Sequence, residues 1–151
     1  MNQNILEKIE ELLQEKDEGA IKKELLALTA FEISEIINQI QRGKRKLFVL
    51  LPPELQADIL LSLNRKSKKT ILPRLGNLLI SRLLHFVNYD SDVCDILQFL
   101  PEKRQEEIIN NLQPFRRSSI LKLLIRLNIA CVAILLARII FNLYSGTGMF
   151  C

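Results

Sequence analysis

The stretch LPPELQADILLSL, residues 51–63, sets the interpretation of the whole chain. Two prolines stand near its start, where a helix loses nothing by lacking a backbone N–H. A leucine opens it, and apolar residues return eight, nine and twelve positions later. One face of a helix would present these positions together. The stretch therefore predicts a short helix whose apolar side needs a neighbouring helix to cover it.

Three other segments carry the same pattern. They are LTAFEISEIINQI (28–40), LGNLLISRLLHFV (75–87) and LPEKRQEEIINNL (100–112), so that the four opening leucines lie 23, 24 and 25 residues apart. Shorter helical pieces begin at Gly43, Arg65, Asp90 and Pro114 between and after them. Helices of about 8 to 14 residues are unstable alone in water. We therefore predict an all-α, right-handed superhelical solenoid of about ten short helices, of the armadillo or HEAT kind. Pro73 is expected to end or kink its helix near Leu72.

Composition agrees with a helical core and a reducing compartment. Hydrophobic residues make up 48% of the 151 residues, and Trp is absent. The three cysteines, Cys94, Cys131 and Cys151, form no CxxC pair, so neither a disulfide framework nor a zinc site is expected. The N-terminus has no basic start followed by an apolar block, so we expect no secretory signal and a cytoplasmic protein.

Charge is distributed unevenly along the chain. Residues 41–85 carry 10 bases and 2 acids, whereas residues 86–112 carry 2 bases and 6 acids. We interpret the lysines of 44–46 and 66–69 as solvated groups at helix starts and inter-helix turns. Nucleic acid is not expected as a partner, because these patches lack interleaved Gly and aromatic residues and a helix-turn-helix signature.

The repeated phrasing resembles a known family. LLPPELQADILLSLNRKSKKTILPRL (50–75) and DSDVCDILQFLPEKRQEEIINNL (90–112) are similar to the N-terminal cytosolic domain of MgtE-type magnesium transporters. Upstream, residues 12–40 resemble the opening helices of that domain. The resemblance runs from about residue 5 to 127, so we divide the chain into a helical repeat domain, 1–127, and an apolar tail, 128–151.

The resemblance implies a regulatory function. In that family the domain lies in the cytosol, on the cytoplasmic face of the inner membrane, and is followed by CBS domains and a transmembrane domain in a homodimer. Mg²⁺ bridges acidic surfaces of the N-terminal and CBS domains and closes the pore. The implied cofactor is therefore a weakly bound, regulatory Mg²⁺, and the membrane is contacted only indirectly.

The acidic stretch 86–112 supplies the metal candidates. Asp92 and Asp95 are spaced to share a helix face, and Asp90 precedes them. Mg²⁺ prefers carboxylate oxygens and keeps several waters, which suits a site completed by a partner. The alternative interpretation is that Asp90 or Asp92 caps a helix and Asp95 is solvated. The weaker candidates are Glu54, Asp58, Glu102, Glu106 and Glu107.

The tail departs from the family pattern. Where the family continues toward its CBS domains, the chain reads IACVAILLARIIFNLYSGTGMFC (129–151). Three interpretations stay open: a final core helix, a membrane-anchoring segment, or the truncated or frameshifted end of a longer gene product. In these 151 residues we recognise neither CBS domains nor a set of membrane helices, so we expect no transport by the chain itself.

We expect no enzymatic activity. His85 is the only histidine, and the glycines form no phosphate-binding loop. The alternative to a magnesium-sensing domain is a non-catalytic helical-repeat module that binds other proteins, similar to the middle domain of the flagellar motor-switch protein FliG.

Overall fold

A computed structural model describes residues 3–128 and 137 of the chain. Within these residues the secondary structure is helical and contains no strand. The elements in chain order are α1 (Gln3–Glu15), α2 (Glu18–Leu26), α3 (Ala30–Gln39), α4 (Lys44–Val49), α5 (Pro53–Ser62), α6 (Arg65–Ile71), the 3₁₀ helix η1 (Leu72–Arg74), α7 (Asn77–Leu84), α8 (Asp90–Leu97) and α9 (Glu102–Asn110). Residues 114–128 follow α9 and are also helical.

The repeat in the sequence is a repeat of helices. Each of α3, α5, α7 and α9 begins two residues after the leucine that opens its segment. Pro52 and Pro101 are the N-caps of α5 and α9. Pro52 is extended because Pro53 follows it, and proline disfavours the helical conformation in the residue before it but fits the first turn of a helix.

Two helices are shorter than the sequence suggested. α4 has 6 residues and α6 has 7. α4 ends before Pro52, which disfavours helical conformation at Leu51. Pro73 ends α6 as predicted, because its ring is incompatible with a continuing α-helix, and the chain tightens into η1.

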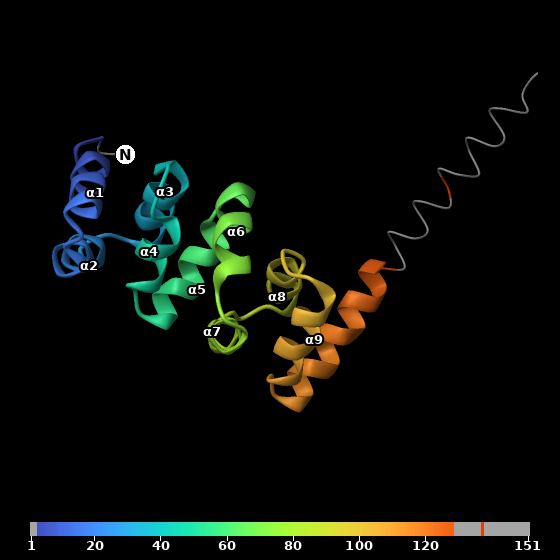
Figure 1. The fold of residues 1–151 in the computed structure, drawn as a ribbon. Helices are drawn as coiled ribbons and strands as arrows, with labels where there is room; N and C mark the ends of the chain where they lie inside the picture. The colour runs from blue at the N-terminus through green and yellow to red at the C-terminus, as the bar shows by residue number, and fades with distance from the viewer. Residues whose placement is uncertain (1–2, 129–136, 138–151) are drawn as a thin grey trace, which may run out of the picture.

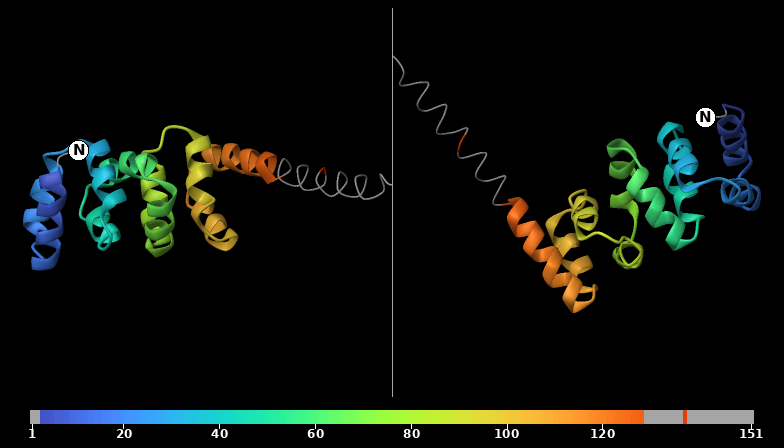
Figure 2. Two further views of the ribbon diagram at one scale, coloured as in Figure 1. Left: turned by 90° about the horizontal axis from the view of Figure 1, so that it is seen from above. Right: turned by 180° about the vertical axis from the view of Figure 1, so that it is seen from behind.

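Alternate helices form a continuous series along the molecule. α3 packs against α5, α5 against α7, and α7 against α9, while α4 packs between α3 and α6. The helices follow one another along one direction of an elongated molecule, from α1 at one end to residues 114–128 at the other (Figures 1 and 2). This arrangement is compatible with the predicted solenoid.

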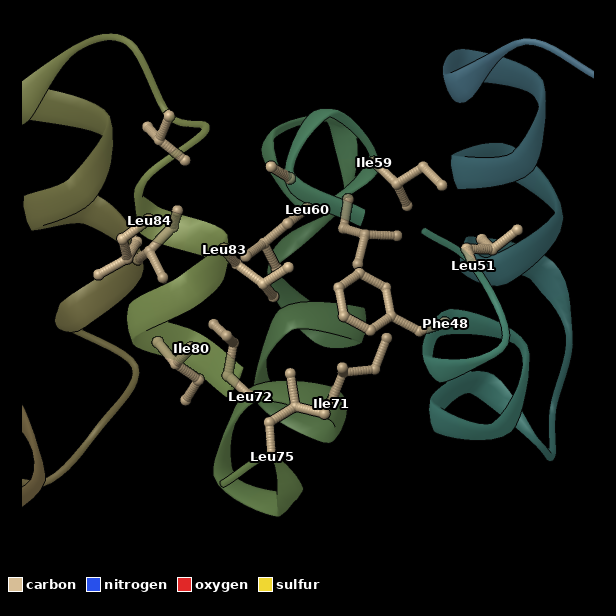
Figure 3. Packing of buried hydrophobic residues seen from close by; sticks show 14 of the residues in the cluster. Phe48, Leu51, Ile59, Leu60, Ile71, Leu72, Leu75, Ile80, Leu83 and Leu84 are labelled. Atoms are coloured by element: carbon tan, nitrogen blue, oxygen red, sulfur yellow. The ribbon is translucent and has the colours of Figure 1, made fainter. Parts of the chain in front are cut away.

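The core runs through the whole stack as one cluster of buried side chains. Figure 3 shows Phe48, Ile59, Leu60, Ile71 and Leu83 meeting between α4, α5, α6 and α7. All five are fully buried. Each such side chain contributes about 1.5–3 kcal/mol of transfer free energy. The short helices are therefore stabilised by their neighbours.

Lys44 is the clearest departure from the sequence analysis, which expected it to be solvated. Its side chain is only 7% exposed. The ammonium donates hydrogen bonds to the carbonyl oxygens of Ile37 and Asn38 and to Oγ of Ser67, at 3.2 Å. Burial, assisted by the charge of Lys66, lowers the pKa of Lys44. The expectation was wrong because the end of α3 offers Lys44 buried carbonyl oxygens that a local sequence pattern does not reveal.

The predicted apolar tail, 128–151, lies outside the described residues except for Asn128 and residue 137. Among the helices of the described part, none has the length and apolar composition needed to cross a membrane.

Candidate functional site: an acidic groove beside α9

Carboxylates gather at a groove between α8, α9 and the helical segment 114–128. The groove has a volume of about 880 Å³. Its acidic side chains are Asp95, Glu102 and Glu106, and its apolar lining is Ile109, Leu121, Leu124, Ile125 and Leu127. We call it the acidic groove.

The helical period places Glu102 and Glu106 side by side on α9. The two residues are four apart and exposed. Ile109 follows Glu106 by three residues, so it lies on the same side of α9 and lines the groove with them, and both it and Ile108 are buried. Glu102 also lies in the first turn of α9, where the helix dipole favours a negative charge. Burial of the isoleucines thus fixes the rotation of α9 that turns these two glutamates toward the groove.

α8 orients Asp95 by the same principle. Cys94, the preceding residue, is fully buried, and its thiol lies 3.9 Å from the carbonyl oxygen of Ile120. Burial raises the pKa of Cys94 to about 11, with smaller contributions from the charges of Asp90 and Asp95. Packing of Cys94 against segment 114–128 leaves Asp95 exposed at the groove.

Asp90 has a different environment from Asp95. Its Oδ1 accepts a hydrogen bond from Nε of Arg116 at 3.0 Å, and both side chains are largely buried. The same guanidinium donates to the carbonyl oxygens of Leu84 and Val87. Asp90 is therefore paired with a counter-ion, and Arg116 of segment 114–128 joins the start of α8 to the end of α7.

The other predicted acids are not all brought together. Asp92 is half-buried in the first turn of α8 and is not part of the groove lining. Glu107 accepts a hydrogen bond from Asn77 of α7. Glu54 and Asp58 are exposed on α5, away from α9 along the stack (Figure 1). Of the eight predicted acids, Asp95, Glu102 and Glu106 share one surface.

The acids of the groove do not form a closed metal site. No group of three or more His, Cys, Asp or Glu side chains within residues 3–128 is placed to hold a metal ion. The arrangement provides separate carboxylate oxygens beside an apolar surface. It suits a hydrated cation that a second acidic surface helps to bind.

The apolar half of the groove was not predicted from the sequence. Leu121 and Ile125 are four residues apart on segment 114–128, with 43% and 57% of their surface exposed. Their spacing could have indicated a second apolar face on this helix. Arg116 was also missed, because nothing local shows that a guanidinium reaches three carbonyl or carboxylate groups.

Comparison with known proteins agrees with this fold. One solved structure, described as the crystal structure of the soluble part of a magnesium transporter, superimposes with a TM-score of 0.64 at 18% sequence identity. The match covers 81% of this chain and 48% of the other, so the chain spans about half the length of that structure. No curated protein sequence matches the chain.

The family assignment rests on the sequence of the repeats themselves. The family described as the MgtE intracellular N domain matches residues 28–125, which run from the segment that contains α3 into segment 114–128 and include the acidic groove. That stretch is more than half of the chain, and the helical fold agrees with the structural neighbour. The chain therefore belongs to the family of MgtE intracellular N domains.

Proposed function

We propose that the chain is a magnesium-sensing regulatory domain of an MgtE-like transporter. The carboxylates of the acidic groove, Asp95, Glu102 and Glu106, bind hydrated Mg²⁺ together with acids of a partner. The observation that carries the proposal is that three acids from two helices line one groove of a domain of this family.

The chemistry of the groove supports a bridging ion. Mg²⁺ keeps several of its waters and is commonly held by one or two protein carboxylates. A domain that supplies only part of the ligands binds weakly alone and tightly when a second acidic surface approaches. The bound ion then stabilises the closed arrangement of the two domains by mass action.

The predicted residues contribute unequally to this proposal. Asp95 is the strongest of the three α8 candidates because it lines the groove. Asp92 lies one turn before it on α8, and Asp90 is already paired with Arg116. Glu107 is hydrogen-bonded to Asn77 and contributes less.

The partners follow from the family. We infer that the acidic groove faces CBS domains of a transporter, in the same chain or another polypeptide, on the cytoplasmic side of the membrane and in a homodimer. The chain regulates and does not catalyse a reaction. The apolar lining of the groove gives a polypeptide partner a surface to pack against in addition to the ion.

Manganese provides a sensitive test of the groove. Mn²⁺ resembles Mg²⁺ in its preference for oxygen ligands, and it broadens the NMR signals of nearby amides even when binding is weak. We expect Mn²⁺ to broaden the amides around Asp95, Glu102 and Glu106, and excess Mg²⁺ to restore them, whereas KCl of equal ionic strength does not.

The chain contains a matched control for this experiment. Glu102→Gln/Glu106→Gln removes two exposed acids four residues apart on α9, and Glu54→Gln/Asp58→Asn removes an equivalent pair on α5. The α9 pair should abolish the broadening near the groove, and the α5 pair should leave it unchanged. Broadening that ignores the α9 substitutions, or that Mg²⁺ cannot reverse, would remove the support for magnesium sensing at this groove.

The protein-binding module is the second candidate function, and the exposed Leu121 and Ile125 favour it. A polypeptide that binds the groove equally well with Mg²⁺ or a chelator, and with the α9 acids neutralised, would establish this function instead.

A further inference from the structure

α4 and α6 carry cations that nearby acids do not balance. From residue 59 to residue 89 the sequence contains six Lys or Arg and no Asp or Glu. Four exposed cationic side chains lie on these two neighbouring helices, and we call them the basic face: Arg45, Arg65, Lys66 and Lys69.

Contacts show how the basic face is arranged. Lys66 lies near enough to the buried ammonium of Lys44, at the start of α4, for its charge to help lower the pKa of Lys44. Arg65 lies over the ring of Phe99, at 5.9 Å from its centroid, on the side of α6 toward α8. Lys69 follows Lys66 and Arg65 by one helical turn. Arg65, Lys66 and Lys69 are thus within about one turn of one another on α6, and Lys66 lies near the start of α4, where Arg45 follows Lys44.

The described residues provide little compensation for this charge. Their ion pairs join Lys8 to Glu24, Lys46 to Glu18 and Arg116 to Asp90, and none involves the basic face. Like charges on adjacent helices repel one another, and an anionic surface relieves that repulsion.

We propose that the basic face binds the surface of an anionic lipid bilayer. Each Lys or Arg close to such a surface contributes about 1 kcal/mol of binding free energy. The inference rests on the proposed function, because a transporter domain is tethered beside the membrane, and tethering raises the effective concentration of lipid headgroups. A bilayer fits better than nucleic acid, since Phe99, the aromatic ring that the described residues place against these cations, is already covered by Arg65.

Vesicle binding of the full chain tests the proposal. We expect the chain to partition onto vesicles of phosphatidylcholine with about 30% phosphatidylglycerol far more strongly than onto pure phosphatidylcholine. Raising KCl from about 0.1 M to about 0.5 M should remove the difference, since screening shortens the reach of exposed charges. The apolar sequence 129–137 contains no charge, so any contribution from it should not distinguish the two vesicle types.

Paired substitutions identify the surface responsible. Lys66→Gln/Lys69→Gln should lower the partition coefficient on anionic vesicles about 30-fold, which is the loss expected from two lysines near the surface. Lys22→Gln/Lys23→Gln removes the same charge from exposed positions of α2 and should change it less than about twofold. Far-UV circular dichroism checks that each variant remains helical.

Three results would overturn the proposal. They are equal partition onto neutral and anionic vesicles, equal losses in the α6 and α2 variants, and tighter binding of a mixed-sequence nucleic acid at the same salt. The last would assign the basic face to nucleic acid. The Mn²⁺ experiment on the α6 variant separates the two proposals, because the acidic groove should respond unchanged even where vesicle binding is lost.

Discussion

At the scale of single residues, one lysine ammonium joins three helices. Lys44 begins α4 and donates to two carbonyl oxygens at the end of α3 and to Ser67 of α6. The bond to the carbonyl oxygen of Ile37 is buried, and a buried acceptor that loses its hydrogen bond costs about 1–3 kcal/mol.

We predict that Lys44→Met lowers the free energy of unfolding by about 1–3 kcal/mol, because the methionine fills the space but donates no hydrogen bond. Urea denaturation measures the change. Lys66→Gln is the matched control, since it removes a charge that adds to the effect of burial on the pKa of Lys44 but leaves the hydrogen bonds of Lys44 in place, and it should not destabilise the protein. Equal destabilisation by both substitutions would contradict the role given to the hydrogen bonds of Lys44.

Cys94 is a buried thiol that should be chemically inert. With a pKa of about 11, only about one molecule in a thousand carries the thiolate at pH 8, whereas an ordinary cysteine is about a quarter ionised. We predict that iodoacetamide modifies Cys94 at least about 100-fold more slowly in the native protein than in urea. Mass spectrometry of the peptide that contains Cys94 measures both rates, and similar rates would show that the thiol is accessible and ionised.

At the scale of elements, the beginning of α3 has a complete capping box. Oγ1 of Thr29 accepts from the backbone N–H of Glu32 at 3.3 Å, and the carboxylate of Glu32 accepts from the backbone N–H of Thr29 at 2.8 Å. These reciprocal bonds satisfy two backbone donors that a helix start leaves free.

We predict that Thr29→Ala lowers the free energy of unfolding by about 1 kcal/mol, because it removes the cap of α3. Thr70→Ala serves as a control, since the Thr70 hydroxyl is bonded only to the carbonyl of Lys66 one turn before it. A larger loss in the control than at Thr29 would argue against the importance of the cap.

The same capping box should make the stability of the protein depend on pH in the acid range. The hydrogen bonds from the backbone and side chain of Thr29 lower the pKa of Glu32 below 4.5. The unfolded chain therefore takes up this proton first, and the stabilisation is full above about pH 4.5 and is lost as the pH falls through the folded pKa. Comparing wild type with Glu32→Gln in urea between about pH 3 and pH 7 measures this difference. If the wild type were still more stable than Glu32→Gln by the same amount at about pH 3, the pH dependence could not be assigned to the Glu32 carboxylate.

Helix positions could be predicted from the sequence to a large extent, and contacts could not. Prolines and the spaced leucines marked the starts of α5 and α9, because these signals act within one turn. The groove was predicted in part: the acidic stretch was recognised, but the association of Asp95 with Glu102 and Glu106 depends on how α8 and α9 turn against segment 114–128. The burial of Lys44 and the pairing of Asp90 with Arg116 depend on residues 6 to 26 positions away, beyond any local pattern.

At the scale of the whole molecule, each helix contacts its near neighbours in the stack. Stability in such an array is close to a sum of unit and interface contributions, so that the ends can open without the middle. α1 packs chiefly against α2, and this pair precedes the stretch 28–125 that matches the family.

We therefore predict that Ile9→Ala opens the first pair of helices selectively. Ile9 is fully buried in α1, and its truncation should cost about 2–5 kcal/mol where it acts. Hydrogen exchange should quicken in α1 and α2 and remain slow in α7 and α9. Leu83→Ala in α7 is the counterpart, since Leu83 is also fully buried but has packed helices on both sides. Leu83→Ala should quicken hydrogen exchange in α5 and α9 as well as in α7. If Ile9→Ala instead reduced protection from hydrogen exchange equally in all helices, the stack would unfold as one cooperative unit. A partner bound at the acidic groove would then stabilise α1 as strongly as α9.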